Sequence, residues 1–435
     1  MLKKYFKSDF IKNVSTLVSG TVIAQAIPIV LTPILSRIYS PKDFGFYGFY
    51  LSILGVLTVI ASGRYHLALF ITKNTAKTIY VFKTTVVVSL FFSAFISIVS
   101  ILFSLYYPSF SNWYYILGLA VLNAALIEAL NIYANIKSDY KIMSSNMIIR
   151  SLIANFFFII LGLWSYGENG LMIGFLMGQI VQILHFYYYY KADFTSHKIN
   201  SRIIKKTLFT YKNFLIHSSV SALLNNLSIQ LPTFFLKNYY NTASVGQYFQ
   251  SYKLLTLPNS LIAKAFGSVF AQNASQRIKN KLPINDIVLS LYKKLVLISF
   301  IPFAILALYG DVIFSWILGQ QWVESGKFAQ IISPWVYINF IVLPFTYLFE
   351  IFQKQKHFSI FNLVLLVSRL IALIIGYYFK DIYLSILLFS IASFFTYGGM
   401  LFYIFKLTKV RGFINYILYI ILFVSMTVLL YTFKL

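Results

Sequence analysis

The chain has 435 residues, of which 59% are hydrophobic, 19% aromatic and only 11% charged. Soluble domains carry about 25% charged residues, so the composition excludes a soluble fold of this length. The net charge of +25 would suit either nucleic acid or a membrane protein with basic loops on one side. Cysteine is absent, which excludes disulfides, thiol catalysis and cysteine metal sites.

The apolar residues come in blocks of about 20, the length of a helix that crosses a ~30 Å hydrocarbon core. The N-terminal stretch MLKKYFKSDFIKN is basic, and no small-residue cleavage site follows it, so it predicts a retained first helix. We predict an all-α integral membrane fold with 12–13 transmembrane helices. The predicted spans are 14–36, 44–62, 80–105, 114–134, 147–166, 170–190, 213–236, 246–269, 288–309, 328–351, 358–379, 382–405 and 413–433.

Lysine and arginine are distributed unequally between the two sides of these spans. With the N-terminus inside, 28 of the 36 basic residues face inward, 6 face outward, and Lys253 and Arg369 fall within spans. This bias predicts a cytoplasmic N-terminus and an outer C-terminus, and it removes the need for a nucleic-acid partner. The outer loops are short. The longest, near 310–327 with Trp316 and Trp322, is expected at the membrane interface.

The sequence matches itself at an offset of 201 residues. LTPILSRIYSPKDFGFYGF, which starts at Leu31, aligns without a gap on PTFFLKNYYNTASVGQYFQ, and Gly45 then aligns with Gly246. We therefore predict two parallel, pseudo-symmetric six-helix bundles, the plan of an alternating-access transporter. The predicted parts are an N-terminal bundle (1–190), a cytoplasmic linker (191–212), a C-terminal bundle (213–406) and an extra transmembrane helix (413–433).

Polar side chains within the spans are the candidate cavity residues, because intramembrane polar groups are costly and usually face a cavity or a partner. The offset pairs Gln25 with Asn226 and places Arg64 one residue from Lys264. Two cations at equivalent inner helix ends would meet a cytoplasmic anion such as a diphosphate. The candidate substrate-binding residues are Gln25, Arg64, Asn225, Asn226, Gln230, Lys253, Lys264 and Arg369, and the candidate coupling residues are Glu128 and Glu350.

Each candidate also has a structural interpretation. Arg64 and Lys264 could extend to the interface as ordinary anchoring side chains. Lys253 and Arg369 could pair with Glu128 or Glu350 as structural locks, and the amides could form interhelical hydrogen bonds only. Pro258 lies between Lys253 and Lys264 and predicts a bend in that span.

Several classes of function lack their usual signals. His66, His185 and His217 show no metal-ligand spacing, so no metal site is expected. No Walker-type loop is present, and the outer acidic residues are dispersed, so neither ATP hydrolysis nor catalysis is predicted. We expect no cofactor, with H+ or Na+ as a coupling ion.

Several segments in order resemble polysaccharide exporters and O-antigen (Wzx-type) flippases, in the superfamily that also holds MATE multidrug exporters and the peptidoglycan lipid flippase. They are LTPILSRIYSPKDFGFYGFYLSI, ASGRYHLALFITKNTAKT, LIEALNIYANIKSDYKIMSSNMIIRS, GENGLMIGFLMGQIV, LLNNLSIQLPTFFL, ILGQQWVESGKFAQIISPW and YLFEIFQKQ. One departure is His66, where the family often carries an acidic residue after GRY.

The resemblance implies a MATE-like two-bundle fold in the bacterial inner membrane. It also implies transfer of an undecaprenyl-diphosphate-linked oligosaccharide to the periplasmic leaflet, for O-antigen, capsule or exopolysaccharide assembly. The implied partners are that lipid-linked substrate, membrane lipids, a glycan polymerase and a chain-length regulator. The alternatives are a small-molecule antiporter of the same fold, which would favour acids over cations in the spans, and a membrane glycan polymerase, which would favour large outer loops.

Overall fold

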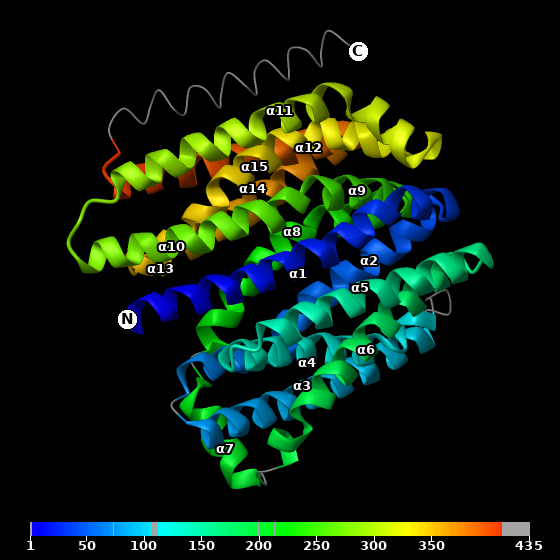
Figure 1. Ribbon diagram of the computed structural model, residues 1–435. Helices are drawn as coiled ribbons and strands as arrows, with labels where there is room; N and C mark the ends of the chain where they lie inside the picture. Colours follow the sequence, from blue (N-terminus) through cyan, green and yellow to red (C-terminus); the bar gives the residue numbers. More distant parts are fainter. Residues whose placement is uncertain are drawn as a thin grey trace. The chain divides into compact units, whose positions relative to one another are not determined.

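The computed structural model describes residues 2–410, apart from 73, 107–111, 196, 198–199 and 213. The described part contains helices and turns but no strand. Ten of its helices are long and apolar enough to cross a membrane. The protein is therefore an all-α, multi-pass integral membrane protein (Figure 1). The predicted extra span 413–433 lies outside the described residues.

The chain divides into two compact units. Unit 1 comprises residues 1–39 and 49–227. Within it α1 packs on α5, α5 on α6, and α3 on α4, and the short η1 packs on both α3 and α4. Its elements are α1 (Leu2–Ile38), most of α2 (Pro41–Ala61), η1 (Tyr65–Ile71), α3 (Thr75–Tyr106), η2 (Asn112–Tyr114), α4 (Leu117–Ile136), α5 (Tyr140–Leu163), α6 (Glu168–Thr195), α7 (Ser201–Thr210), η3 (Phe214–Ser218) and the start of α8 (Ser219–Tyr239).

Unit 2 comprises residues 40–48 and 228–435. Its central helix is α12, which packs against α9, α11 and α15 and is buried on nearly every side. Its elements beyond α8 are α9 (Thr242–Leu255), η4 (Asn259–Ala263), α10 (Lys264–Lys279), α11 (Asn285–Leu318), η5 (Gln320–Trp322), α12 (Val323–Val342), η6 (Leu343–Phe345), α13 (Tyr347–Ile351), α14 (Gln355–Tyr378) and α15 (Ile382–Leu407).

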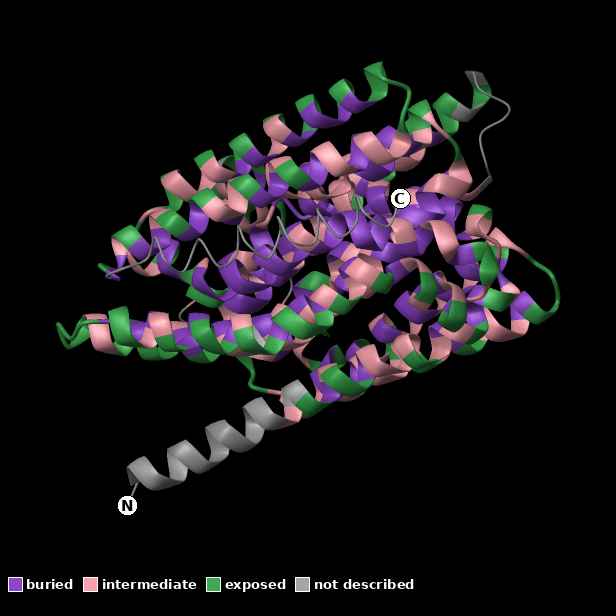
Figure 2. Cartoon of the chain, turned by 90° about the horizontal axis from the view of Figure 1, so that it is seen from above, coloured by how far each residue is buried: buried purple, intermediate pink, exposed green. Residues whose placement is uncertain are grey.

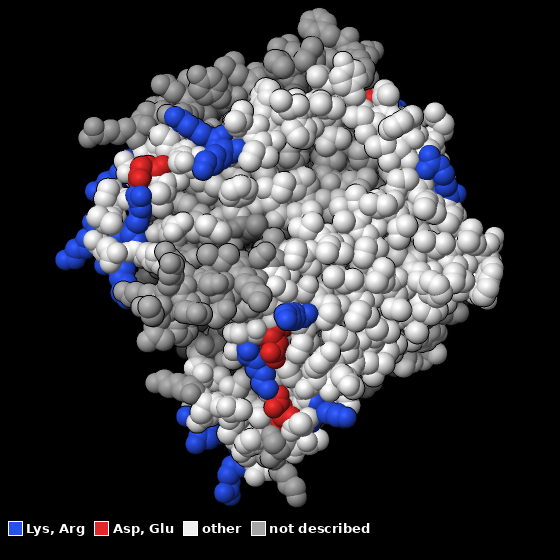
Figure 3. Space-filling model, viewed as in Figure 1, with Lys and Arg blue, Asp and Glu red and all other residues white. Residues whose placement is uncertain are grey.

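Most helices carry one buried and one exposed side (Figure 2). On α11 the exposed residues recur at helical spacing and are large and apolar: Leu297 is 77% exposed, Ile301 63% and Trp316 81%. Such a stripe would be unfavourable in water and is suited to lipid. Figure 3 shows the same property on the molecular surface, where wide areas carry no charge.

The predicted loop 310–327 is wrong in its extent. Helix α11 continues to Leu318 through a kink at Tyr309, and α12 begins at Val323. Gly319, with a φ of 107°, makes the turn between them. Trp316 is highly exposed, whereas Trp322 is fully buried against Phe44.

The 201-residue repeat is visible in how α2 and α9 begin. Ser40 and Asp43 cap α2 reciprocally, and at the equivalent position Asn241 caps α9 by accepting a hydrogen bond from the Ser244 N–H at 2.8 Å. A Cβ atom added to Gly45 would lie 1.8 Å from the carbonyl oxygen of Thr242, and one on Gly246 would lie 1.8 Å from that of Pro41. Equivalent glycines thus contact equivalent carbonyls reciprocally, and both belong to unit 2.

The two repeats differ at the ends of these helices. Helix α2 stops at Ala61, whereas the equivalent part of the second repeat continues through the π-helical η4 into α10. The bend predicted at Pro258 coincides with this break between α9 and α10. Where the first repeat makes a turn after α2, the second repeat therefore continues as a helix.

Candidate functional site

The turn after α2 holds Arg64 in an unusual backbone conformation. In the described chain seven non-glycine residues have positive φ, and six of them lie two positions beyond the end of a helix, where left-handed residues are common. After α2 that position belongs to Gly63, with a φ of 53°. Arg64, with a φ of 57°, follows it and is not needed to end the helix. A left-handed non-glycine residue costs roughly 1–2 kcal/mol, so the fold holds Arg64 there at a cost.

The Arg64 side chain lies partly buried at this turn. Its Nε is buried and donates no hydrogen bond to any described residue. Burial lowers the pKa of Arg64, and the opposing negative charge of Glu128 on α4 raises it again. Tyr65 anchors the turn by donating to the carbonyl of Leu208 at 3.3 Å. The guanidinium is thus fixed at one end of unit 1 with an unsatisfied donor.

His66 lies beneath this arginine and links it to the bundle. The Oγ of Ser62 lies 2.7 Å from His66 Nδ1, and His66 Nε2 lies 3.7 Å from a carboxylate oxygen of Glu128. Burial, reinforced by the positive charge of Arg64, lowers the pKa of His66 to about 4. The imidazole is therefore neutral near pH 7, and its side chain is only 4% exposed against 46% for Glu128.

Arg369 is fully buried in unit 2. Its Nε donates to Ser393 Oγ at 2.8 Å, and its Nη1 donates to the carbonyl and Oγ of Ser228 at 3.1 and 3.0 Å. The guanidinium carbon also lies 4.6 Å from the ring centre of Phe389 and 4.9 Å from that of Trp335. No described carboxylate pairs with Arg369. Its partners are serine and aromatic side chains and not Glu128 or Glu350, with which an ion pair was predicted. Arg369 ties α8, α14 and α15 together, which favours its structural interpretation.

The other predicted site residues occupy both units. Gln25 is half-buried on α1, and Asn225 and Asn226 are half-buried on the part of α8 in unit 1. Gln230 on α8 and Lys253 in the last turn of α9 are half-buried in unit 2, and Glu350 is exposed on α13. Lys264 begins α10, and its side chain lies outside the described part. Within one unit, the structure brings Arg64 together with Glu128.

Three of the important partners were not predicted. Ser62 is the hydrogen-bond partner of His66, and Ser228 and Ser393 hold Arg369. The spacing of four between Ser62 and His66 gave a weak signal, because such residues share a helical face. Nothing in the sequence marks Ser228 or Ser393, since serine is common in membrane helices.

A family model described as polysaccharide biosynthesis protein matches residues 34–327, more than half of the chain. The chain belongs to this polysaccharide biosynthesis family. No curated protein matches it. The described fold of this polysaccharide biosynthesis protein is that of the MATE and MOP transporters.

Three solved structures illustrate this fold. An inward-facing multidrug resistance MATE family transporter has a TM-score of 0.67 at 13% identity, over 92% of this chain and 98% of the other. The lipid II flippase MurJ in an inward closed conformation has a TM-score of 0.65 at 16% identity, over 96% and 97%. A MOP superfamily transporter from Pyrococcus furiosus has a TM-score of 0.62 at 14% identity, over 92% and 96%. At these identities the likeness concerns the fold.

Proposed function

We propose that this polysaccharide biosynthesis protein is a flippase that moves an undecaprenyl-diphosphate-linked oligosaccharide from the cytoplasmic to the periplasmic leaflet by alternating access. The observation that carries the proposal is Arg64, a cation in a costly backbone conformation with a buried, unused donor. Strain of this kind persists where the surrounding structure fixes a residue for a purpose. The family membership and the transporter fold support the same function.

A diphosphate is the ligand that Arg64 suits best. A guanidinium offers planar, paired donors that match phosphate oxygens, and such charge-assisted hydrogen bonds are short and strong. Because the turn fixes the backbone and burial restricts the side chain, less conformational entropy is lost when the ligand binds. In this proposal the N-terminus is cytoplasmic, so Arg64 at the inner end of α2 meets the substrate first. Gln25, Asn226 and Lys253 would line the route of the sugar, Lys264 would assist capture, and no covalent chemistry takes place.

Replacing Arg64 by glycine separates capture from folding. Glycine adopts a φ of 57° freely, so the backbone strain is relieved while the guanidinium is lost. In a bacterial host that lacks its own flippase, we expect surface glycan to fall at least about tenfold, because two or more charge-assisted bonds of ~1.5–3 kcal/mol disappear. Surface glycan is measured by gel staining and protein abundance by immunoblot.

Two further variants serve as controls for this experiment. Arg64→Lys keeps the charge but loses the planar donor pair, and it should give an intermediate glycan level. Arg64→Ala combined with Lys264→Ala should abolish surface glycan at normal protein abundance. Wild-type glycan in the Arg64→Gly variant would refute the capture role.

We further propose that Glu128 is the resting counter-ion of Arg64 and carries the coupling proton. When the diphosphate reaches Arg64, the carboxylate is displaced from its partner and faces a new negative charge. Taking up one proton from water neutralises it, and releasing that proton after the substrate leaves restores the pair. His66 stays neutral because its pKa is near 4, so it lies beside Glu128 without titrating. Arg64 is the charged group that acts on both residues, and Ser62 is the polar partner of His66.

The coupling proposal is tested in liposomes that contain the purified protein and the host's lipid-linked oligosaccharide. Transfer by the wild type should respond to an imposed pH gradient by about threefold or more, an effect within the usual range of coupling free energies. Glu128→Gln should make the rate independent of the gradient, since it mimics the protonated acid. His66→Gln should keep the response. A gradient response that survives in Glu128→Gln, or is lost only in His66→Gln, would contradict the assignment.

A further inference from the structure

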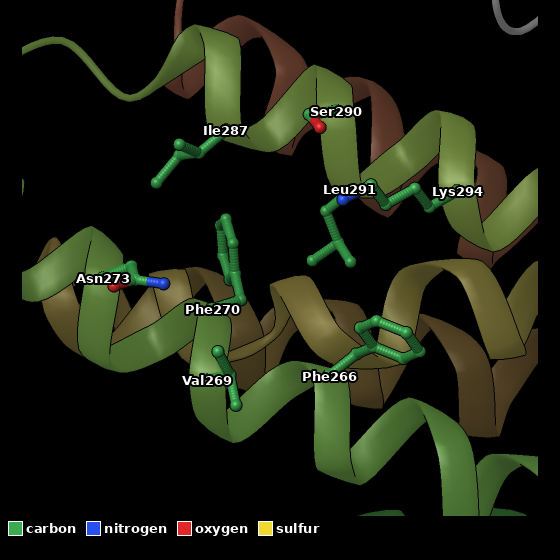
Figure 4. Close-up of a pocket in the computed structure, with 8 residues that line it drawn as sticks. All are labelled: Phe266, Val269, Phe270, Asn273, Ile287, Ser290, Leu291 and Lys294. Carbon is green, nitrogen blue, oxygen red and sulfur yellow. The ribbon is translucent and has the colours of Figure 1, made fainter.

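An apolar groove lies between α10 and α11 in unit 2, separate from the Arg64 turn (Figure 4). Its cavity volume is about 230 Å³. Phe270 forms its buried floor and stacks edge-on against Phe345 of η6 at 5.2 Å, because α10 packs on η6 and α13. Leu291 closes the opposite wall from α11, and Val269, 56% exposed, lies at the open side. The groove is therefore open to whatever surrounds the helices, which is lipid in a membrane.

One end of the groove carries a positive charge, that of Lys294. Lys294 runs back along α11 toward Leu291, so that its ammonium lies at the edge of the gap between the two helices (Figure 4). Ser290 on α11 and Asn273 on α10 also line the groove, and Asn273 lies at the end away from Lys294 (Figure 4). Lys294 is the tenth residue of α11, which places its backbone ~14 Å from the helix start at 1.5 Å per residue. A lysine at that depth extends its ammonium toward the interface and keeps its methylenes among apolar groups.

The surroundings of the groove add further positive charge. Residues 264–310 contain six basic residues and a single acid, Asp286. That acid is already paired, because both of its carboxylate oxygens lie 2.7 Å from Arg277 Nη1. Lys279, at the end of α10, and Lys281, in the connection to α11, are exposed. Residues 264–310 therefore carry a net positive charge.

We propose that this groove binds one anionic phospholipid, with an acyl chain on Phe270 and Leu291 and its phosphate at Lys294. Basic pockets between transmembrane helices are a known type of site for acidic lipid head groups. A single lysine at the end of one apolar groove suits a phosphate diester that carries a hydrocarbon chain. The site lies apart from Arg64 and does not depend on the flippase proposal.

Native mass spectrometry of the purified full-length protein tests this site with phosphatidylglycerol and phosphatidylcholine as probes. We expect the wild type to retain phosphatidylglycerol in preference, and Lys294→Gln to weaken that retention at least about fivefold, since each lysine near an anionic surface contributes ~1 kcal/mol. Lys293→Gln is the matched control: it removes the same charge from the neighbouring residue, which does not line the groove. Val269→Trp, placed at the open side, should displace the lipid while the charge remains.

Each outcome has a defined meaning. Equal losses in Lys294→Gln and Lys293→Gln, or equal retention of the two phospholipids, would show only diffuse attraction and overturn the site. The wild type could instead retain undecaprenyl diphosphate more strongly than phosphatidylglycerol and lose that retention in Lys294→Gln. This result would assign the groove to the substrate's tail and overturn the phospholipid proposal. The mass measurement needs no transport, so its result stands apart from the surface-glycan experiment.

Discussion

Replacing Arg369 by alanine should lower the stability of unit 2 by about 3–5 kcal/mol, the range for large-to-small changes in a packed core. The change removes three hydrogen bonds to Ser228 and Ser393 and empties the space beside Trp335 and Phe389. The serine hydroxyls can satisfy themselves on their own helices, but the cavity and the lost aromatic contacts remain. For a unit of this size the unfolding midpoint in detergent should fall by roughly 10 °C.

The controls for Arg369 separate its charge from its shape. Arg369→Lys keeps the charge, but an ammonium group lacks the planar donors that bind both serines at once. This variant should therefore recover only part of the stability that Arg369→Ala loses. Arg277→Ala removes an exposed ion pair with Asp286 and should cost ~0–1 kcal/mol. A midpoint for Arg369→Ala that equals that of Arg277→Ala would show that the buried arginine contributes little to stability.

Replacing Gly246 by alanine should force the first turns of α2 and α9 apart. The new Cβ would lie 1.8 Å from the carbonyl oxygen of Pro41, and this atom is backbone, so no side chain can rotate away. Overpacking of this kind typically costs about 1–3 kcal/mol, and contact with rigid backbone places the expected loss at the upper end. The unfolding midpoint reports the cost. Gly399→Ala is the matched control, because no atom of the described residues lies within 4 Å of the added Cβ on α15.

The reciprocal arrangement of the two glycines predicts non-additivity. Gly45→Ala should cost a similar amount, because its Cβ would meet the carbonyl of Thr242 at 1.8 Å. Once one substitution has separated the helices, the second added Cβ clashes less with the opposite carbonyl. The double variant should therefore lose less stability than the two single variants lose together. Strict additivity would mean that each helix adjusts alone, and that the two positions do not form one contact.

Much of the fold could be predicted because hydrophobic length and charge bias act along the chain itself. The spans through α6 and from α11 to α15 correspond to predicted ones, and the aligned Gly45 and Gly246 mark the contact between the repeats. The loop near 310–327 was overestimated because Asp311, Glu324 and Lys327 look like loop residues. In the structure Gln330 donates to Asp311 at 3.0 Å and Lys327 lies 2.9 Å from Glu324, so helices accommodate these charges.

The site was harder to predict because it depends on rotation about helix axes and on backbone conformation. Arg369 was selected because it falls within a predicted span, but its enclosure by Trp335 and Phe389 depends on how α12, α14 and α15 are rotated about their axes. Arg64 was selected from its position and sign of charge. Its left-handed φ is set by packing around η1, and no sequence pattern indicates it.

The π-helical turn η4 also bears on how this segment can vary in length. Each turn of a π-helix holds about one residue more than a turn of an α-helix, so losing one residue from Asn259–Ala263 would restore regular winding. Because the extra residue is contained within that single turn, α10 would stay close to its present rotation about the helix axis. Phe270 would then keep its place against Phe345, and the groove beside α11 would keep its floor. Loss of a second residue has no such turn to absorb it, and it would rotate α10 by about 100°.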